Sequence, residues 1–118
     1  MLVGPSRLGK TEWARSLGHH VYWNAYYRLD DWDDRARLVV VDDVAGLDIK
    51  SAHWRALIGG QKEFVMTDKY RGKKKINGGK AVIILCNPDM DFYPGLDQNC
   101  RDWFDINVDR IYLTNKLF

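Results

Sequence analysis

The chain has 118 residues, of which 46% are hydrophobic, 13% aromatic and 29% charged, and its formal net charge is +2. This length favours a single domain, and the composition is that of a folded protein and excludes a disordered chain. No apolar run approaches the roughly 20 residues that a membrane-spanning helix needs, and the apolar start is too short for a signal peptide. We therefore expect an intracellular protein with no membrane partner.

The predicted elements alternate between strands and helices. In chain order, the first half predicts a strand at residues 1–3, a helix at 10–17 that Gly18 ends, a strand at 21–23, a loop or short helix at 30–37 and a strand at 38–41. The second half predicts a helix at 49–58, a β-hairpin at 64–76, a strand at 81–85, a short helix at 99–104 and a strand at 110–113. The apolar runs at 38–41 and 81–85 are uninterrupted, which is typical of strands buried on both faces of a parallel sheet. Together the elements predict an α/β sandwich with a mostly parallel sheet.

Positive charge is concentrated in one segment. Residues 68–80 contain six basic residues and one acid, so this segment carries +5 and the rest of the chain −3. Such a concentration favours a polyanionic partner, and a solvated basic loop is the alternative.

A glycine-rich loop at residues 4–11 matches the pattern G-x-x-x-x-G-K-[ST] at every fixed position. Glycines let backbone N–H groups turn inward around a phosphate, and the following helix directs its positive end at the same anion. We expect Lys10 to reach the β- and γ-phosphates and Thr11 to ligate Mg²⁺. The predicted nucleotide-binding residues are Gly4, Pro5, Ser6, Arg7, Leu8, Gly9, Lys10 and Thr11. The alternative is a glycine-rich turn without a ligand.

Polar side chains follow both buried strands. Asp42 and Asp43 come after the first, at the carboxyl end where ligands sit in open parallel sheets. We expect Asp42 to ligate Mg²⁺ and Asp43 to act as a base or to position water, whereas a helix cap or turn is the alternative. Asn87 follows the second strand, where its amide can contact the γ-phosphate or the attacking water. The alternative for Asn87 is a turn, because Asn-Pro commonly opens one.

Five segments occur in a characteristic order: residues 4–11, Val-Val-Val-Asp-Asp-Val at 39–44, Lys69-Tyr70, Gly78-Gly79 and Leu-Cys-Asn-Pro at 85–88. In this order they resemble the superfamily 3 helicase domain of Rep proteins, the replication initiators of small circular single-stranded DNA viruses of geminivirus and genomovirus type. Residues 13–18 add to the likeness to geminivirus Rep. The resemblance implies an AAA+-like P-loop ATPase, a three-layer sandwich with an inserted basic β-hairpin. It further implies ATP and Mg²⁺ as cofactors, single-stranded DNA as partner, a hexameric ring and the host cell nucleus.

The resemblance also implies residue roles. Asn87 becomes the sensor of the γ-phosphate. The hairpin element at residues 61–79 is expected to bind one DNA strand with steep salt dependence, since lysines neutralise phosphates and aromatic faces stack on bases. Its predicted DNA-binding residues are Lys69, Tyr70, Lys73 and Lys74. Arg101, with Arg110 as second candidate, is the predicted arginine that a neighbouring subunit supplies to the site, and pairing with local acids is the alternative.

The sequence departs from full-length Rep proteins in two respects. It contains neither the His-hydrophobic-His motif nor the nucleophilic tyrosine motif of their HUH endonuclease domain, so we predict no nicking activity, and we expect Tyr22, Tyr26 and Tyr27 to be packing or interface aromatics. Only three residues precede the loop, so we expect residues 1–118 to be an N-terminally truncated helicase domain with a partly unpaired sheet. The predicted function is an ATP-dependent DNA helicase domain of a viral rolling-circle replication initiator. The alternatives are a P-loop ATPase or kinase that does not act on DNA, and an inactive nucleotide- or DNA-binding fragment.

Overall fold

A parallel sheet forms the centre of the molecule. The computed structural model describes residues 1–44, 47–68 and 72–114. The sheet consists of β1 (Leu2–Val3), β2 (His20–Asn24), β3 (Leu38–Asp42), β6 (Ala81–Cys86) and β7 (Ile111–Tyr112). Their order is β2-β3-β6-β1-β7, and all four pairings between neighbours are parallel. The prediction of an α/β fold with a mostly parallel sheet is confirmed.

The alternation of side chains in β3 explains its place in the sheet. All five of its residues are buried. Leu38 and Val40 pack on one face beside Ala14, whereas Val39 and Val41 pack on the other. A strand with apolar residues on both faces has to be covered by helices on both sides.

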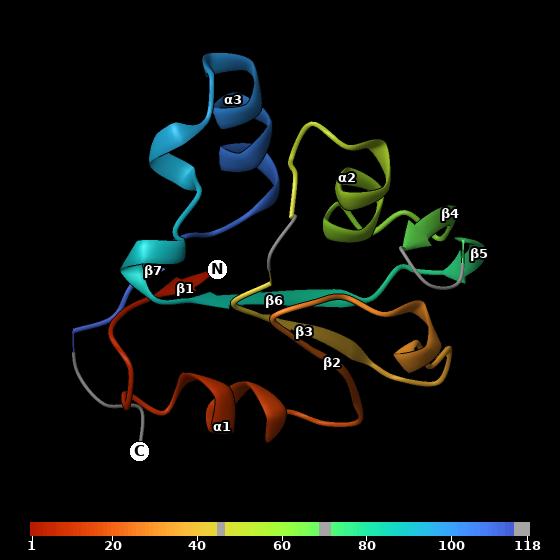
Figure 1. Cartoon of the computed structure of the whole chain (residues 1–118), viewed down its shortest axis with the longest axis horizontal. Coiled ribbons are helices and arrows are strands. Elements are labelled where there is room, and N and C mark those ends of the chain that lie inside the picture. Colours follow the sequence, from red (N-terminus) through yellow and green to blue (C-terminus); the bar gives the residue numbers. More distant parts are fainter. Residues whose placement is uncertain (45–46, 69–71, 115–118) are drawn as a thin grey trace.

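Helices cover both faces of the sheet and give three layers (Figure 1). On one face lies α1 (Lys10–Arg15), and on the other lie α2 (Ala52–Ile58) and α3 (Gln98–Asn107). The described residues also form three short 3-10 turns, η1 (Leu29–Asp31), η2 (Pro88–Met90) and η3 (Tyr93–Gly95). Among the described residues, no helix is both long enough and apolar enough to cross a membrane.

The helices differ from the predicted ones at their ends. Helix α1 ends two residues earlier than predicted. Leu17, which follows it, is 48% exposed, so packing of this side chain in the core does not extend the helix. Helix α2 begins late because Asp48 accepts a hydrogen bond from the backbone N–H of Lys50 and so forms a turn. Helix α3 begins one residue earlier than predicted, because Asp97 caps its first turn by accepting from the backbone N–H of Cys100, and it ends three residues later, at Asn107.

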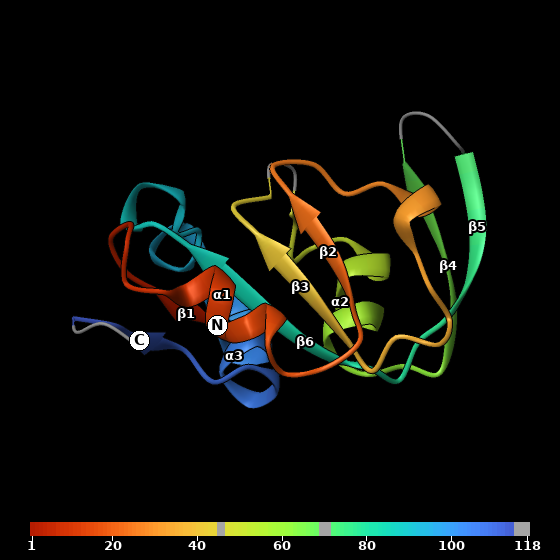
Figure 2. The ribbon, with the colours of Figure 1, turned by 90° about the horizontal axis from the view of Figure 1, so that it is seen from below.

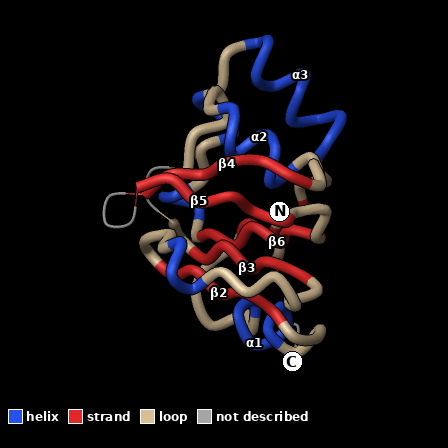
Figure 3. Tube along the Cα trace, turned by 90° about the vertical axis from the view of Figure 1, so that its right-hand side faces the viewer, coloured by secondary structure: helices blue, strands red, loops and turns tan. Residues whose placement is uncertain are grey.

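The predicted hairpin is present as a separate two-stranded sheet. It pairs β4 (Glu63–Asp68) with β5 (Gly72–Asn77) in antiparallel register, and its tip at 69–71 lies outside the described residues. Met66 and Ile76 are fully buried in the core cluster that contains residues of β2, β3 and α2. Figure 2 shows the hairpin at the opposite end of the molecule from β1 and α3, and Figure 3 shows it on the α2 side of the central strands. At its exit, a Cβ on Gly78 would lie 2.3 Å from the carbonyl oxygen of Gln61, so this position requires glycine.

The first strand is short but central. Leu2 pairs with Leu85 of β6 and Ile111 of β7, and Val3 pairs with the following residue of each strand. Among the described residues, positions 81–84 of β6 therefore have a strand neighbour only on the β3 side.

Candidate functional site

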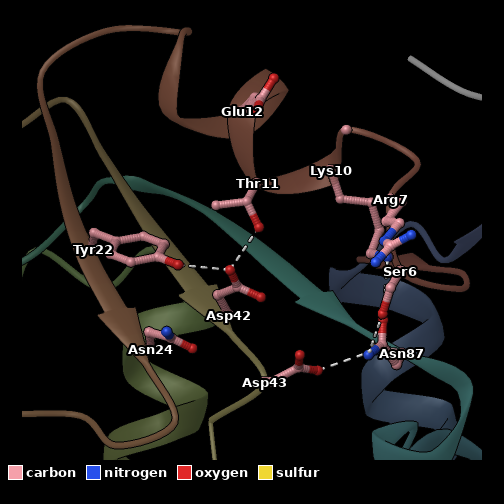
Figure 4. Close-up of a pocket in the computed structure, with 11 residues that line it drawn as sticks. Ser6, Arg7, Lys10, Thr11, Glu12, Tyr22, Asn24, Asp42, Asp43 and Asn87 are labelled. Atoms are coloured by element: carbon pink, nitrogen blue, oxygen red, sulfur yellow. Dashed lines mark hydrogen bonds between the residues drawn. The ribbon is translucent and has the colours of Figure 1, made fainter. Parts of the chain in front are cut away.

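A pocket of about 450 Å³ lies at the carboxyl ends of the central strands (Figure 4). It is lined by Ser6, Arg7, Gly9, Lys10, Thr11, Glu12, Tyr22, Asn24, Asp42, Asp43 and Asn87. The structure thus brings the loop at residues 4–11 together with the predicted polar side chains that follow β3 and β6. Strand β6 separates β3 from β1 in the sheet, so Asn87 lies between the loop and the two acids.

The backbone of the loop is fixed by close contacts and by left-handed residues. Arg7 has φ 67° and Gly9 has φ 82°, so the loop reverses direction immediately before α1. A Cβ on Gly4 would lie 2.9 Å from the carbonyl oxygen of Leu113, so only glycine fits there. The backbone N–H of Gly4 donates to the carbonyl of Cys86 over 3.1 Å, which ties the loop to the end of β6.

The ammonium group of Lys10 lies at the centre of the loop. Its side chain is buried, with 8% of the residue exposed. Nζ donates to the carbonyls of Gly4 (2.7 Å) and Pro5 (2.8 Å) and, over 3.4 Å, to Oδ1 of Asn87. All three acceptors are uncharged oxygens, and no carboxylate in the described part of the chain forms an ion pair with Lys10. A buried cation with neutral partners creates a positive potential that favours an anion.

Asp42 connects three elements through one carboxylate oxygen. Its Oδ2 accepts a hydrogen bond from the hydroxyl of Thr11 on α1 and another from the hydroxyl of Tyr22 on β2, each over 2.7 Å. Burial, followed by the hydrogen bond to Asp42, raises the pKa of Tyr22 to about 12, so its hydroxyl stays protonated at neutral pH. Asp42 is 9% exposed at the end of β3, where a carboxylate and a hydroxyl together offer hard oxygen ligands.

Asp43 and Asn87 are linked to each other and to the loop. Asp43 has a left-handed backbone with φ 49°, and its Oδ1 accepts from the backbone N–H of Asn87 over 3.1 Å. The side-chain amide of Asn87 donates to the hydroxyl of Ser6 over 3.2 Å. Asn87 also opens the turn considered from the sequence, because its carbonyl accepts from the backbone N–H of Met90. The backbone of Asn87 therefore forms the predicted turn, whereas contact of its side-chain amide with a γ-phosphate or a water molecule stays a prediction.

The sequence analysis missed part of the pocket. Tyr22 is not only a packing aromatic, as we expected, because its hydroxyl reaches Asp42. Tyr27 does pack, against Trp54 at 5.2 Å between ring centroids. Tyr22 and Asn24 alternate with the buried Trp23 along β2, and period-two alternation is the signal that groups them on one face.

Two of the predicted DNA-binding lysines, Lys73 and Lys74, lie on opposite faces of β5. Lys74 pairs with the buried Met66, and its charge lowers the pKa of Asp34, in addition to the larger effect of hydrogen bonds from side chains. Lys73 pairs with Thr67 on the exposed face. Neighbouring residues of a strand point in opposite directions, so Lys73 and Lys74 do not share one face of β5, and the binding of DNA by either lysine stays a prediction. Lys69 and Tyr70 lie outside the described residues.

The structure does not bring Arg101 into the pocket. Its Nη2 donates to the carbonyls of Pro94 (3.2 Å) and Leu96 (3.3 Å), and its guanidinium lies over the ring of Tyr93. Its partners are thus loop carbonyls rather than the acids considered from the sequence. Arg110 pairs with Asp91. A role for either arginine in a neighbouring subunit stays a prediction.

Comparisons with known proteins find relatives among viral replication proteins. No protein-family model matches the chain. It is 41% identical over 112 residues to the Replication-associated protein of Bean yellow dwarf virus, 43% over 106 residues to that of Tobacco yellow dwarf virus (strain Australia), and 38% over 107 residues to that of Maize streak virus genotype D (isolate Raw). These matches cover 95%, 90% and 90% of the chain but 33%, 31% and 30% of the viral proteins, so the chain spans about a third of the length of the curated relatives it matches. Over nearly its whole length, the chain is therefore homologous to one part of the Replication-associated proteins of geminiviruses.

Proposed function

We propose that the chain is a P-loop ATPase of AAA+-like type, which acts as the superfamily 3 helicase domain of a viral rolling-circle replication protein. The observation that carries the proposal is the buried ammonium of Lys10 inside a glycine-rich loop, beside the hydrogen-bonded pair of Thr11 and Asp42. The strand order supports it as well, because Asn87 at the end of β6 lies between the loop and the acids.

The residues of the pocket fit a nucleoside triphosphate with Mg²⁺. Lys10 supplies positive charge, and the loop backbone is already fixed in a turn. In the described part of the chain, no group of three or more His, Cys, Asp or Glu side chains is arranged to hold a metal ion. Thr11 and Asp42, whose side-chain oxygens lie 2.7 Å apart, would be the protein ligands, because Mg²⁺ is usually bound through one or two carboxylates together with phosphate oxygens and water. When bound, Mg²⁺ would offset the negative charge of the phosphates.

The remaining polar side chains suit the handling of a water molecule. Asp43 is the group that we assign to orient water or to accept its proton. Asn87 holds Asp43 through its backbone N–H and contacts Lys10 through its side chain, so it joins the anion-binding group to the water-positioning group. We therefore assign to Asn87 the role of the residue that senses the γ-phosphate and links it to Asp43.

The assignment of DNA as partner rests on the relatives and on the hairpin. The relatives are named Replication-associated proteins. Lys73 and Lys75 alternate with the inward-facing Lys74 and so lie on one exposed face of β5, as a sequence-independent grip on DNA phosphates requires. Assembly as a hexameric ring and action in the host cell nucleus belong to the same proposal.

An ATPase assay with and without single-stranded DNA tests this proposal. We expect turnover that DNA stimulates, and we expect Lys10→Ala to abolish it because the charge facing the phosphates is lost. Lys50→Ala is the matched control, since Lys50 is an exposed lysine that pairs only with Asp97 at 3.5 Å among the described residues. Equal turnover of the wild type and Lys10→Ala would reject the site. An ATPase rate that DNA does not change would favour an ATPase or kinase with another substrate. Nucleotide binding without ATP hydrolysis would favour an inactive fragment.

A further inference from the structure

We propose that Tyr22 is a positioning residue for the magnesium site, and that its hydroxyl holds the Asp42 carboxylate in the orientation that directs Oδ1 to the metal. This inference rests on the proposed function, because it concerns the same pocket. Nothing in the sequence motifs includes Tyr22, which lies on β2, outside both the loop and the acid pair.

The two carboxylate oxygens of Asp42 have different surroundings. Oδ2 accepts from both Thr11 and Tyr22 at 2.7 Å, so two O–H donors from opposite elements occupy this oxygen. In the described part of the chain, Oδ1 has no hydrogen-bond partner, and Figure 4 shows it pointing away from Tyr22 into the pocket. Because hydrogen bonds fix one oxygen of the carboxylate, the other oxygen has a fixed direction. Residues that hydrogen-bond to metal ligands commonly orient them in this way.

The position of Tyr22 is itself fixed from the helix side. The guanidinium of Arg15 lies over its ring, with Cζ 4.2 Å from the ring centroid. Arg15 follows Thr11 by four residues on α1, so the same helix face holds both the Asp42 carboxylate and the Tyr22 ring. Arg15 is also anchored, because its Nε donates to Nε2 of His20 over 3.2 Å.

The position of Tyr22 is fixed from the strand side as well. Its neighbours Val21 and Trp23 are 2% and 1% exposed, and both lie in the core cluster on the opposite face of β2. A rotation of β2 about its axis that moved Tyr22 away from Asp42 would expose the side chains of Val21 and Trp23 to solvent. The hydroxyl is therefore directed at Asp42 by the core of the protein, not only by its own hydrogen bond.

The variant Tyr22→Phe removes the hydroxyl and keeps the ring beneath Arg15. We would measure binding of a fluorescent ATP analogue across a series of Mg²⁺ concentrations and in excess EDTA. We expect the half-saturating Mg²⁺ concentration to rise about tenfold, since loss of a group that supports a metal ligand costs about 10–100-fold in metal affinity. Binding in EDTA should not change. Tyr26→Phe is the matched control, because Tyr26 is 66% exposed and two residues beyond the strand, and it should behave as the wild type.

The outcomes separate this inference from the proposed function. A wild type that binds no nucleotide with Mg²⁺ would reject the proposed function and this inference with it. Normal wild-type binding with an unchanged Mg²⁺ requirement in Tyr22→Phe would overturn the inference alone. An equal loss of binding in Mg²⁺ and in EDTA would also overturn it, because it would indicate a general structural role. As a second variant, Arg15→Ala frees the ring and should raise the Mg²⁺ requirement in the same direction, and no change there would count against the positioning role.

Discussion

The hairpin lysines allow a comparison within one strand. Lys73 and Lys74 are neighbours of the same type on β5, but Lys73 is exposed beside Thr67 whereas Lys74 pairs with the buried Met66. If the exposed face grips DNA phosphates, Lys73→Ala removes one phosphate contact. Each contact to single-stranded DNA contributes about 0.7 to the slope of log affinity against log salt concentration. We therefore expect the slope of Lys73→Ala to be smaller than that of the wild type by about 0.7.

The size of this effect makes it measurable. Over a fourfold rise in salt, the ratio of wild-type to Lys73→Ala affinity should fall by roughly 2.6-fold, because 0.7 is the exponent of the salt dependence. Fluorescence anisotropy of a labelled oligothymidine at four or more salt concentrations provides the slopes. Lys74→Ala is the control and should keep the wild-type slope. Equal slopes for Lys73→Ala and Lys74→Ala, whether both reduced or both unchanged, would refute the assignment of one DNA-binding face.

Three further predictions concern stability and the arginine assignment. Trp54→Ala should lower the free energy of unfolding in urea by about 3–5 kcal/mol, because Trp54 is fully buried against Trp23, and a loss under 1 kcal/mol would mean that this core is not packed as described. The backbone N–H of Cys100 holds the pKa of Asp97 below its usual value, so Asp97 stabilises the fold fully above pH 3.8 and loses this effect as the pH falls further. The stability deficit of Asp97→Ala should accordingly be constant between neutral pH and about pH 5 and shrink in stronger acid, and a deficit that grows on acidification would contradict the cap. Arg101→Ala should lower the free energy of unfolding by about 1 kcal/mol through loss of its carbonyl partners, whereas unchanged unfolding with lost turnover would support the arginine-finger assignment.

Much of the central sheet could be predicted because its signals are local. The apolar runs of β3 and β6 are uninterrupted, and a polar side chain directly follows each run. Because parallel strands have their carboxyl ends at one edge, the meeting of the loop with Asp42 and Asn87 followed from the order of the elements alone. The cap at Asp97 was also visible in the sequence but was not recognised, and for this reason the start of α3 was predicted one residue late.

The directions in which Tyr22 and the hairpin lysines point could not be predicted, because the sequence does not show which face of a strand borders the core or the pocket. Alternation along β2 groups Tyr22 with Asn24, but only the parallel register with β3, in which Asn24 is opposite Asp42, shows that this face borders the acids. Alternation along the predicted hairpin already separates Lys73 from Lys74, but only the fully buried Met66, which pairs with Lys74, shows which of the two faces is the inner one. These facts depend on contacts between distant segments, which no local pattern contains. The partners of Arg101 could not be predicted either, since they are backbone carbonyls of the 3-10 turn η3 and of the residue that follows it.

The central claim is that the loop around Lys10 holds a nucleoside triphosphate. Calorimetric titration of the chain with ATP and Mg²⁺, compared with the same titration of Lys10→Ala, tests it most directly. We predict saturable binding to the wild type and an affinity about 10–100-fold lower in the variant, as expected when charge-assisted hydrogen bonds to an anion are lost. Equal affinities of the two proteins, or no binding by a folded wild type, would contradict the account.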